Sequence, residues 1–317
     1  MNATRSSTEN VLVGPSLVAE AVGLAQTLET DGAVRLPRLV SDETLKEMQD
    51  AFASRLRFFR LNNVDGYERT ERKRLMVEDV LTLAQGFVDI ALHPLVTAVL
   101  GKYCGLGYEL CEAKGWQTQP TKKDFHGWHG DAWYDQTKVT GSIPREVKLA
   151  FYLTDVKTGA FQYIRGSHGK QVPYHLERSD AEKLPLEALM DFLGPAGTAV
   201  LFDTSGIHRQ GIPILEPRRA VFYNYHDPDV PLQKGDVEFY RYHPLLLNAA
   251  LLGGLAPEHM RILGFGNQTN YQASFISQPS HPRFHACVRN VQGTLLHLDY
   301  WSRRVFNRLV RVFAKRA

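Results

Sequence analysis

The chain has 317 residues, 44% of them hydrophobic and 22% charged, with a formal net charge of +3. This length and composition are sufficient for one large domain with a substantial core. Residues 301–317 hold six basic and no acidic residues, which leaves 31 basic against 34 acidic residues in the rest of the chain. Positive charge confined to one terminal segment does not indicate a nucleic-acid enzyme, and we expect no nucleic-acid partner.

The sequence predicts a cytoplasmic protein. It has no run of about 18 apolar residues that could span a membrane, and its first residues are polar, which argues against a signal peptide. Three cysteines, Cys104, Cys111 and Cys287, are too few and too scattered for a disulfide framework or a zinc site. We expect them to be reduced thiols.

The first third of the chain is typical of helices separated by one short strand. In chain order we predict a helix over 16–30 with Ser16 as its N-cap, a strand over 33–36, a helix from Ser41 to about 56 and a helix over 82–101. A charged run at 66–76 is expected to be a solvated loop or helix face.

From about residue 107 the pattern changes to short strands separated by Gly, Pro and Asp. The clearest strands are predicted over 108–116, 147–154, 198–203 and 219–225. In the second of these, Val147, Leu149 and Phe151 alternate with Lys148 and Ala150, as in a half-buried strand. Closely spaced strands favour a sandwich or barrel. We expect a single domain over 1–317, with a helical part at 1–106, a β core at 107–226 and an extension at 227–317.

The sequence His129-Gly-Asp131 predicts two metal ligands. Side chains two apart on an extended strand project to the same face, so His129 and Asp131 can bind one metal ion. His208, in a later Gly-rich segment, can supply a third ligand. Two histidines and one carboxylate are typical of Fe(II) oxygenases, because three octahedral positions stay open for a chelating cosubstrate and O2.

An arginine eleven residues after His208 predicts the anchor for that cosubstrate. A 2-oxoacid that chelates iron needs a cation at a fixed distance for its far carboxylate, and a guanidinium can donate two parallel hydrogen bonds to it. Arg218 and Arg219 are chemically equal, but strand alternation sends them to opposite faces. We predict Arg219, whose face would be shared by Val221 and Tyr223.

These residues resemble the phytanoyl-CoA dioxygenase family of iron and 2-oxoglutarate oxygenases over roughly residues 30–226. The motifs that carry the resemblance are His129-Gly-Asp131, the strand from Lys148 to Thr154, the run Gly159–His168 with its Gly166-Ser-His168 turn, His208 and Arg219. The resemblance implies a double-stranded β-helix, or jelly roll, in a mainly β fold with N-terminal helices. It also implies Fe(II) on His129, Asp131 and His208, and 2-oxoglutarate on Arg219.

Further site residues are proposed by position. Relatives commonly have Gln after the first ligand and Ser two residues after His208, where this chain has Gly130 and Gln210, and we expect Gln210 to contact the cosubstrate. Trp133 and Tyr134 follow the first ligands and are candidate substrate contacts, as is Arg165. We do not expect the remaining nearby histidines, His126, His168 and His226, to be ligands.

The segment 300–316 predicts a basic amphipathic helix. Trp301, Val305, Leu309, Val312 and Phe313 form an apolar stripe, and arginines occupy other faces. Such a helix can lie on an anionic membrane surface, or can dock on the domain or on a partner subunit, which is the commoner arrangement in soluble proteins.

The function predicted from the sequence is a dioxygenase that uses Fe(II), 2-oxoglutarate and O2 to oxidise, in the first place to hydroxylate, a C–H bond of a small organic substrate. Lipid-linked compounds and secondary-metabolite intermediates are the candidates. An alternative is a vestigial jelly-roll scaffold that binds a membrane or partner through its C-terminal helix. A cupin-type isomerase or hydrolase with another metal is a third, but it would have no need for the paired arginine.

Overall fold

The computed structural model describes residues 15–57, 74–124, 127–170, 172, 175–231 and 245–266, together with isolated positions between 287 and 308. The chain divides into two compact units, Met1–Tyr271 and Gln272–Ala317. Part of the charged run, residues 66–73, lies outside the described residues, as do His126 and most of the predicted helix at 300–316. Among the helices described, none is long and apolar enough to cross a membrane.

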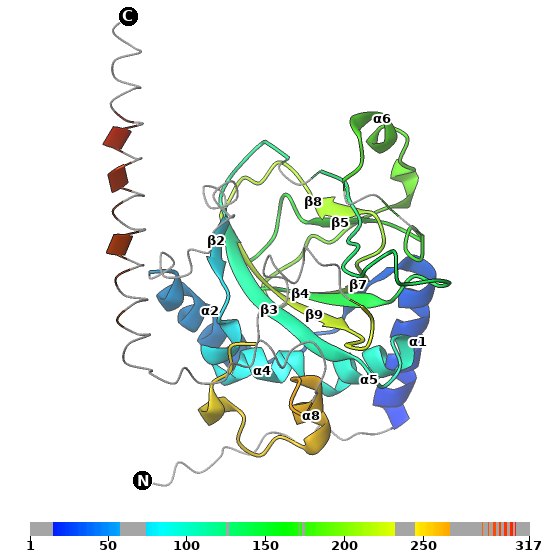
Figure 1. Ribbon diagram of the computed structural model, residues 1–317, viewed down its shortest axis with the longest axis horizontal. Helices are drawn as coiled ribbons and strands as arrows, with labels where there is room; N and C mark the ends of the chain where they lie inside the picture. Colours follow the sequence, from blue (N-terminus) through cyan, green and yellow to red (C-terminus); the bar gives the residue numbers. More distant parts are fainter. Residues whose placement is uncertain are drawn as a thin grey trace, which may run out of the picture. The chain divides into compact units, whose positions relative to one another are not determined.

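Two antiparallel sheets form the core of the first unit (Figure 1). The large sheet has the strand order β1-β7-β4-β9-β3-β2, with bounds Ala33–Leu36 (β1), Ala199–Asp203 (β7), Glu146–Tyr152 (β4), Arg218–His226 (β9), Glu109–Thr118 (β3) and Arg74–Val77 (β2). The small sheet has the order β6-β5-β8, with bounds Leu189–Asp191 (β6), Phe161–Ile164 (β5) and His208–Gln210 (β8). The expected mainly β jelly-roll architecture with additional helices is confirmed.

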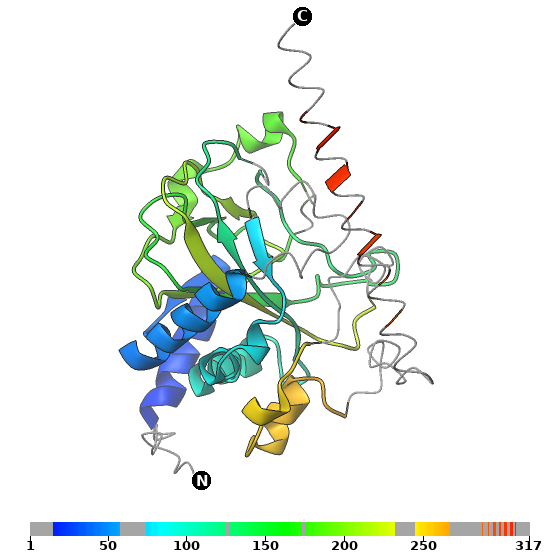
Figure 2. The same ribbon diagram turned by 90° about the vertical axis from the view of Figure 1, so that its left-hand side faces the viewer.

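One face of the large sheet is covered by helices (Figure 2). The covering helices are α1 (Pro15–Asp31), α2 (Asp42–Leu56), α4 (Gln85–Ala91), α5 (Pro94–Tyr103) and α8 (Pro257–Ile262). Val147, Leu149 and Phe151 of β4 pack with them in the main hydrophobic core, as their alternation predicts. We call this the helix-covered face.

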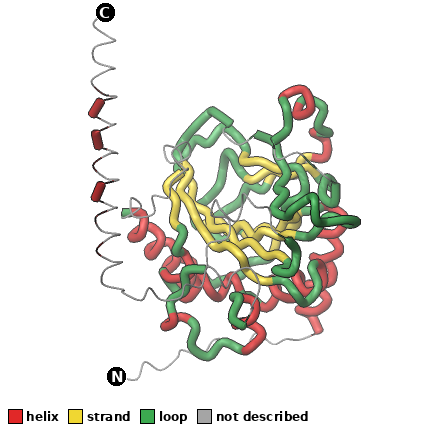
Figure 3. Tube along the Cα trace, viewed as in Figure 1, coloured by secondary structure: helices red, strands yellow, loops and turns green. Residues whose placement is uncertain are grey.

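The opposite face of the large sheet, which we call the interior face, packs against the small sheet. Ala150 of β4 and Phe202 of β7 share a buried cluster with Phe161 and Tyr163 of β5. The tube drawing in Figure 3 separates the strands of this core from the helices and from the remaining loops. Two short helical segments, α6 (Arg178–Ala181) and η3 (Leu186–Ala188), interrupt the loop between β5 and β6. Since side chains alternate along a strand, the even-numbered residues of β4 and β9 belong to the interior face.

The long helix predicted over 82–101 is wrong, because the chain forms two helices there, α4 and α5, preceded by a single 3-10 turn, η2 (Val80–Thr82). The break falls at His93-Pro94. Proline lacks a backbone N–H and disfavours a helical conformation in the residue before it. His93 adopts a non-helical conformation and caps α5, with its Nδ1 accepting a hydrogen bond from the Leu95 backbone N–H at 3.2 Å.

The other predicted helices and strands agree with the structure to within a few residues. Ser16 is not an N-cap, because α1 already begins at Pro15, and residues 74–76 of the charged run belong to the strand β2 instead of a solvated loop or helix face. The helix expected from Ser41 is α2, and the Ser41 hydroxyl caps it by accepting from the Thr44 backbone N–H at 3.2 Å. The apolar run at 245–255 contains one 3-10 turn, η4 (Ala249–Leu251). The short strands β2, β5, β6 and β8 were not predicted, because three or four residues carry too little periodicity to be recognised.

His226 ends β9 completely buried, with its ring stacked on Trp133 at a centroid distance of 4.2 Å. Burial lowers the pKa of this imidazole to about 3. In the unfolded chain its pKa would be about 6.5. Between about pH 6.5 and pH 3 the unfolded chain therefore binds a proton at His226 that the folded protein does not bind. The free energy of unfolding falls as pH decreases below about 6.5.

We predict that His226→Phe makes the metal-free protein less sensitive to acid. The free energy of unfolding, measured by urea denaturation at pH 7 and pH 5, should fall between the two pH values by about 2 kcal/mol less in the variant than in the wild type. The quantity compared is the difference in the free energy of unfolding between pH 7 and pH 5 within each protein. A loss of stability that is equal at both pH values does not affect it. Equal losses in both proteins would contradict the prediction.

Candidate metal centre

Three side chains converge at one end of the space between the sheets. His129, Asp131 and His208 each offer a ligand atom, and these atoms all lie within 4.8 Å of one another. His129 Nε2 lies 3.9 Å from Asp131 Oδ1, and His208 Nε2 lies 3.9 Å from Asp131 Oδ2. The sequence-predicted ligand set is thus brought together, with Asp131 and His208 buried.

Hydrogen bonds to the backbone orient both imidazoles. His129 Nδ1 lies 3.0 Å from the Gly127 carbonyl, and His208 Nδ1 lies 2.8 Å from the Gly206 carbonyl. A carbonyl can only accept, so each Nδ1 carries the proton and each Nε2 presents its lone pair. Such a partner on the non-ligating nitrogen is typical of histidines that bind metals.

The two histidines are joined directly by their main chains. The His129 N–H donates to the His208 carbonyl at 3.0 Å, and the His208 N–H donates to the His129 carbonyl at 2.8 Å. Two residues after His129, the Asp131 N–H donates to the Thr204 carbonyl at 2.8 Å. Backbone pairing therefore brings the three ligand residues together.

Gly130 permits this close approach. A Cβ atom at this position would lie 2.9 Å from the Ser205 carbonyl oxygen and 3.0 Å from Val172 Cβ. Separations this short do not occur for real Cβ atoms next to backbone. A side chain here would push the ligand loop away from the turn that precedes His208.

A network of hydrogen bonds fixes that turn. Asp203 Oδ2 accepts from the Tyr103 hydroxyl at 2.6 Å, and Asp203 Oδ1 accepts from the backbone N–H and the hydroxyl of Ser205. On its other side, the Ser167 hydroxyl accepts from the Ile207 N–H at 2.7 Å. The Gly-Ser-His turn identified in the sequence thus holds the residue next to His208.

Burial keeps both histidines uncharged. It is the main cause that lowers the pKa of His129 below its usual value and that of His208 to about 3. The neighbouring imidazole also disfavours a positive charge on His208, while Asp131 partly opposes the shift. Neutral imidazole is the form that binds a metal ion, so the site is prepared for one near pH 7.

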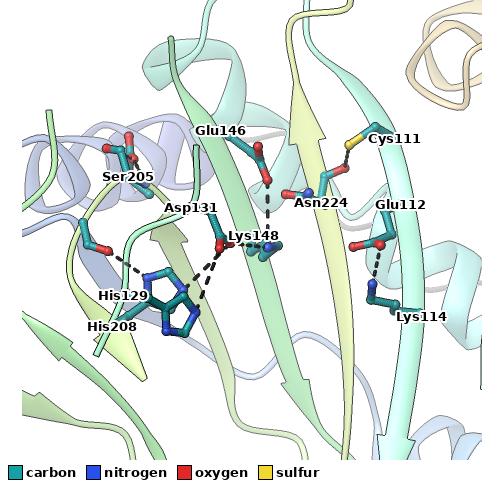
Figure 4. Close-up of polar contacts among 12 residues, drawn as sticks. Cys111, Glu112, Lys114, His129, Asp131, Glu146, Lys148, Ser205, His208 and Asn224 are labelled. Atoms are coloured by element: carbon teal, nitrogen blue, oxygen red, sulfur yellow. Dashed lines mark hydrogen bonds and ion pairs between the residues drawn. The ribbon is translucent and has the colours of Figure 1, made fainter. Parts of the chain in front are cut away.

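Lys148 is a polar partner of the site that sequence reasoning missed (Figure 4). Its Nζ lies 2.7 Å from Asp131 Oδ2 and 3.9 Å from Glu146 Oε1. The ammonium thus engages one carboxylate oxygen of Asp131. The sequence did contain a sign of this, because Lys148 interrupts the apolar residues of β4 on the face opposite Val147 and Leu149.

The predicted anchor arginine, Arg219, does not point toward the metal centre. It shares the helix-covered face with Val221 and Tyr223, as expected, but the ligands lie on the other side of the sheet. Its Nε donates to Gln117 Oε1 at 2.8 Å on the neighbouring strand. The alternation of the two arginines was predicted, but a strand pattern alone does not tell which face holds the site.

Arg218 instead lies on the interior face and is buried. Its Nη1 donates to the carbonyl of Gly159, just before β5, and β5 pairs with the strand that carries His208. Burial lowers the pKa of this guanidinium to about 10, so it remains positively charged near pH 7. Arg218 is therefore the buried cation that can face a ligand between the sheets.

Two buried polar atoms, one on β3 beside Arg218 and one on β8, have no hydrogen-bond partner. Thr118 is the cross-strand neighbour of Arg218, and its hydroxyl has no partner. Gln210, two residues after His208, accepts from Arg74 Nη2 at 3.2 Å, but its own Nε2 has no partner. Buried polar groups are seldom left unsatisfied, so these donors fit a bound anionic group.

The remaining predicted residues are placed as follows. Trp133 and Tyr134 are buried together with Cys111, and Trp133 packs against His226. Arg165 forms an ion pair with Asp31 at 2.5 Å on the surface. Their roles as substrate contacts stay predictions.

Fold and ligand set together define a jelly-roll protein with a two-histidine, one-carboxylate metal site. The model of the family Phytanoyl-CoA dioxygenase (PhyH) matches residues 28–211, more than half of the chain. The chain belongs to this family, which confirms the resemblance found in the sequence. Its donors suit the iron and 2-oxoglutarate with which that resemblance associates the family.

Similar solved structures have the same fold at low sequence identity. EctD from S. alaskensis, crystallised with 2-oxoglutarate and 5-hydroxyectoine, is 18% identical over 72% of this chain and 81% of its own, with a TM-score of 0.53. The epimerase SnoN, in complex with Fe3+, alpha ketoglutarate and nogalamycin RO, is 16% identical over 70% of this chain and 89% of its own, with a TM-score of 0.51. No curated protein matches the sequence.

We predict that Gly130→Ala weakens metal binding by about tenfold or more, because a displaced ligand loop separates His129 and Asp131 from His208. Calorimetric titration of the metal-free protein with Mn(II) measures the change. Gly107→Ala is the matched control, since a Cβ there meets nothing within 4 Å. Equal Mn(II) affinity in both variants would contradict the role given to Gly130.

Proposed function

We propose that the chain is an Fe(II)- and 2-oxoglutarate-dependent oxygenase that hydroxylates a C–H bond of a small organic substrate. The observation that carries the proposal is the convergence of His129, Asp131 and His208, with both Nε2 atoms oriented by backbone carbonyls. Three protein ligands leave three octahedral positions, which a bidentate cosubstrate and O2 can share. The complete ligand set argues against a vestigial scaffold.

In this reaction the substrate, 2-oxoglutarate and O2 give the hydroxylated substrate, succinate and CO2. When bound, iron and 2-oxoglutarate supply the oxidising power, and the four electrons that O2 accepts come from the decarboxylated cosubstrate and the substrate. The chain's own residues position the reactants. His129, Asp131 and His208 would hold the metal ion, and Arg218 would orient the cosubstrate.

Arg218 is the proposed anchor for the far carboxylate of 2-oxoglutarate. The support is its burial on the interior face together with the free donors of Thr118 and Gln210. A guanidinium with two further donors can satisfy both oxygens of a carboxylate. An apolar surrounding strengthens each of these hydrogen bonds.

Hydroxylation is the simplest outcome of this chemistry, but the same cofactor set also serves other oxidations. The similar structure SnoN is described as an epimerase. The mass of the product distinguishes the outcomes, since hydroxylation adds one oxygen, desaturation removes two hydrogens and epimerisation leaves the mass unchanged.

A cytoplasmic location and contact of residues 300–316 with a membrane stay predictions from the sequence. Of that segment only Trp301, Ser302, Val305, Phe306 and Arg308 are described.

Replacement of a ligand should abolish the activity. We expect Asp131→Ala and His208→Ala to reduce 2-oxoglutarate-dependent succinate formation to the background of metal-free protein. Each should also lose the weak visible charge-transfer band that Fe(II) and 2-oxoglutarate give anaerobically in the wild type. Full turnover in either variant, or no band in the wild type, would refute the proposed function.

The two adjacent arginines provide a paired test of the anchor. Arg218→Met should raise the 2-oxoglutarate concentration needed for half-maximal charge-transfer absorbance by about 100-fold, because two charge-assisted hydrogen bonds are lost. Arg219→Met is the matched control, since its side chain lies on the helix-covered face. A larger effect at Arg219 than at Arg218 would return the role to the residue predicted from the sequence.

A further inference from the structure

The interior face of the large sheet is divided into an apolar part and a polar part. Phe161, Tyr163 and Phe202 pack around the ring of His208, and all three are buried. Their side chains fill the space between the sheets on that side of the metal centre. The polar part lies on the other side, beyond Asp131.

The polar part is a row of side chains that crosses three adjacent strands. Asn224 of β9 is in register with Lys148 of β4 and with Glu112 of β3. Residues directly opposite one another in antiparallel strands project to the same face and lie about 5 Å apart at Cβ. We call Lys148, Asn224, Glu112 and the adjacent Lys114 the polar row, and it begins at Asp131 through the Lys148 contact of 2.7 Å.

Charged groups of both signs occupy the two ends of the polar row (Figure 4). Lys148 contacts Asp131 and lies 3.9 Å from Glu146 Oε1, while Glu112 and Lys114 form an ion pair with each other. The side chains of Lys148, Glu112 and Lys114 are 17%, 12% and 17% exposed, so solvent still reaches this part of the interior face. The polar row is therefore in partial contact with solvent, unlike the buried apolar cluster.

Asn224 lies between these two ends and is only 4% exposed. In Figure 4 its side-chain amide lies between the Glu146–Lys148 pair and the Glu112–Lys114 pair. Its Oδ1 is buried and has no hydrogen-bond partner. An unsatisfied buried acceptor costs free energy unless a ligand or water supplies a donor.

We propose that the polar row is the substrate subsite and that the substrate is a polar molecule that carries hydroxyl or amine donors, not an aliphatic acyl chain. This inference rests on the proposed oxygenase function and specifies its substrate. A hydroxyl or amine can donate to Asn224 Oδ1 next to the metal centre, while neighbouring groups can exchange hydrogen bonds with Glu112 and Lys114. The contact from Lys148 to Asp131 makes the metal centre continuous with this subsite.

An acyl chain in the same place would be unfavourable. It would remove water from the Glu112–Lys114 ion pair and from the Lys148 ammonium without replacing any hydrogen bond. It would also leave Asn224 Oδ1 unsatisfied in a drier surrounding. The charges of the row thus select against the lipid-linked substrates considered from the sequence.

The first experiment compares two panels of probe compounds on the wild-type enzyme with Fe(II) and 2-oxoglutarate. One panel holds aminocyclitols, monosaccharides and hydroxylated amino acids, and the other holds myristate and myristoyl-CoA. We expect at least one polar compound to stimulate succinate formation and to appear as an oxidised product by mass spectrometry. Stimulation by the acyl compounds alone, or by no polar compound, would overturn the inference.

The second experiment changes the acceptor. Asn224→Leu should lower kcat/KM for the stimulating polar compound by about 10- to 100-fold, because a buried hydrogen bond is lost. Gln117→Leu is the matched control, an amide on the helix-covered face of the same sheet, and should keep the wild-type value. Equal kcat/KM in the Asn224→Leu variant and the wild type would refute the assignment.

The anaerobic charge-transfer band separates this inference from the proposed function. In Asn224→Leu the band and its dependence on 2-oxoglutarate should match the wild type, because the proposed cosubstrate contacts are Arg218, Thr118 and Gln210. A normal band with failure of the polar panel rejects the polar subsite and leaves the oxygenase proposal standing. Absence of the band from the wild type rejects the oxygenase itself.

Discussion

The main-chain pairing of His129 with His208 is the constraint on which the site depends. Two reciprocal hydrogen bonds of 3.0 and 2.8 Å join residues that are far apart in the sequence. Because backbone geometry is stiff, the pairing fixes the separation of the imidazoles before any metal binds. Neighbouring residues stabilise this contact. Gly130 allows the ligand loop to approach the Ser205 carbonyl closely, and Asp203 and Ser167 form hydrogen bonds with the turn that precedes His208.

The same enclosure that fixes the ligands also sets their protonation. Burial between the sheets lowers the pKa of both histidines and leaves them neutral, as metal binding requires. One ligand, Asp131, is joined through Lys148 to polar side chains that remain partly exposed on the interior face. The metal centre is thereby bordered by a buried apolar cluster on one side and a partly exposed polar row on the other. In the proposed function, the substrate lies on the side of the polar row.

Residue patterns predicted the elements that are long and regular. The alternation of Val147, Leu149 and Phe151 identified β4 and its helix-covered face, and Ser41 marked the start of α2. Patterns failed where a local rule or a short length decided the result. Pro94 divides the helix expected over 82–101, and β8 with only three residues carries no periodicity, although it positions a metal ligand.

The sequence by itself determined the metal ligands and the family, because His129, Asp131 and His208 are identities that side-chain chemistry can interpret without coordinates. It also determined that the two adjacent arginines face opposite ways. Only the tertiary structure decided that Arg218 is the one on the interior face, since the covering helices α2, α4 and α5 pack on the other side. Strand alternation is symmetric between faces, and only long-range packing breaks that symmetry. The row of Lys148, Asn224 and Glu112 likewise depends on strand register, which no local pattern specifies.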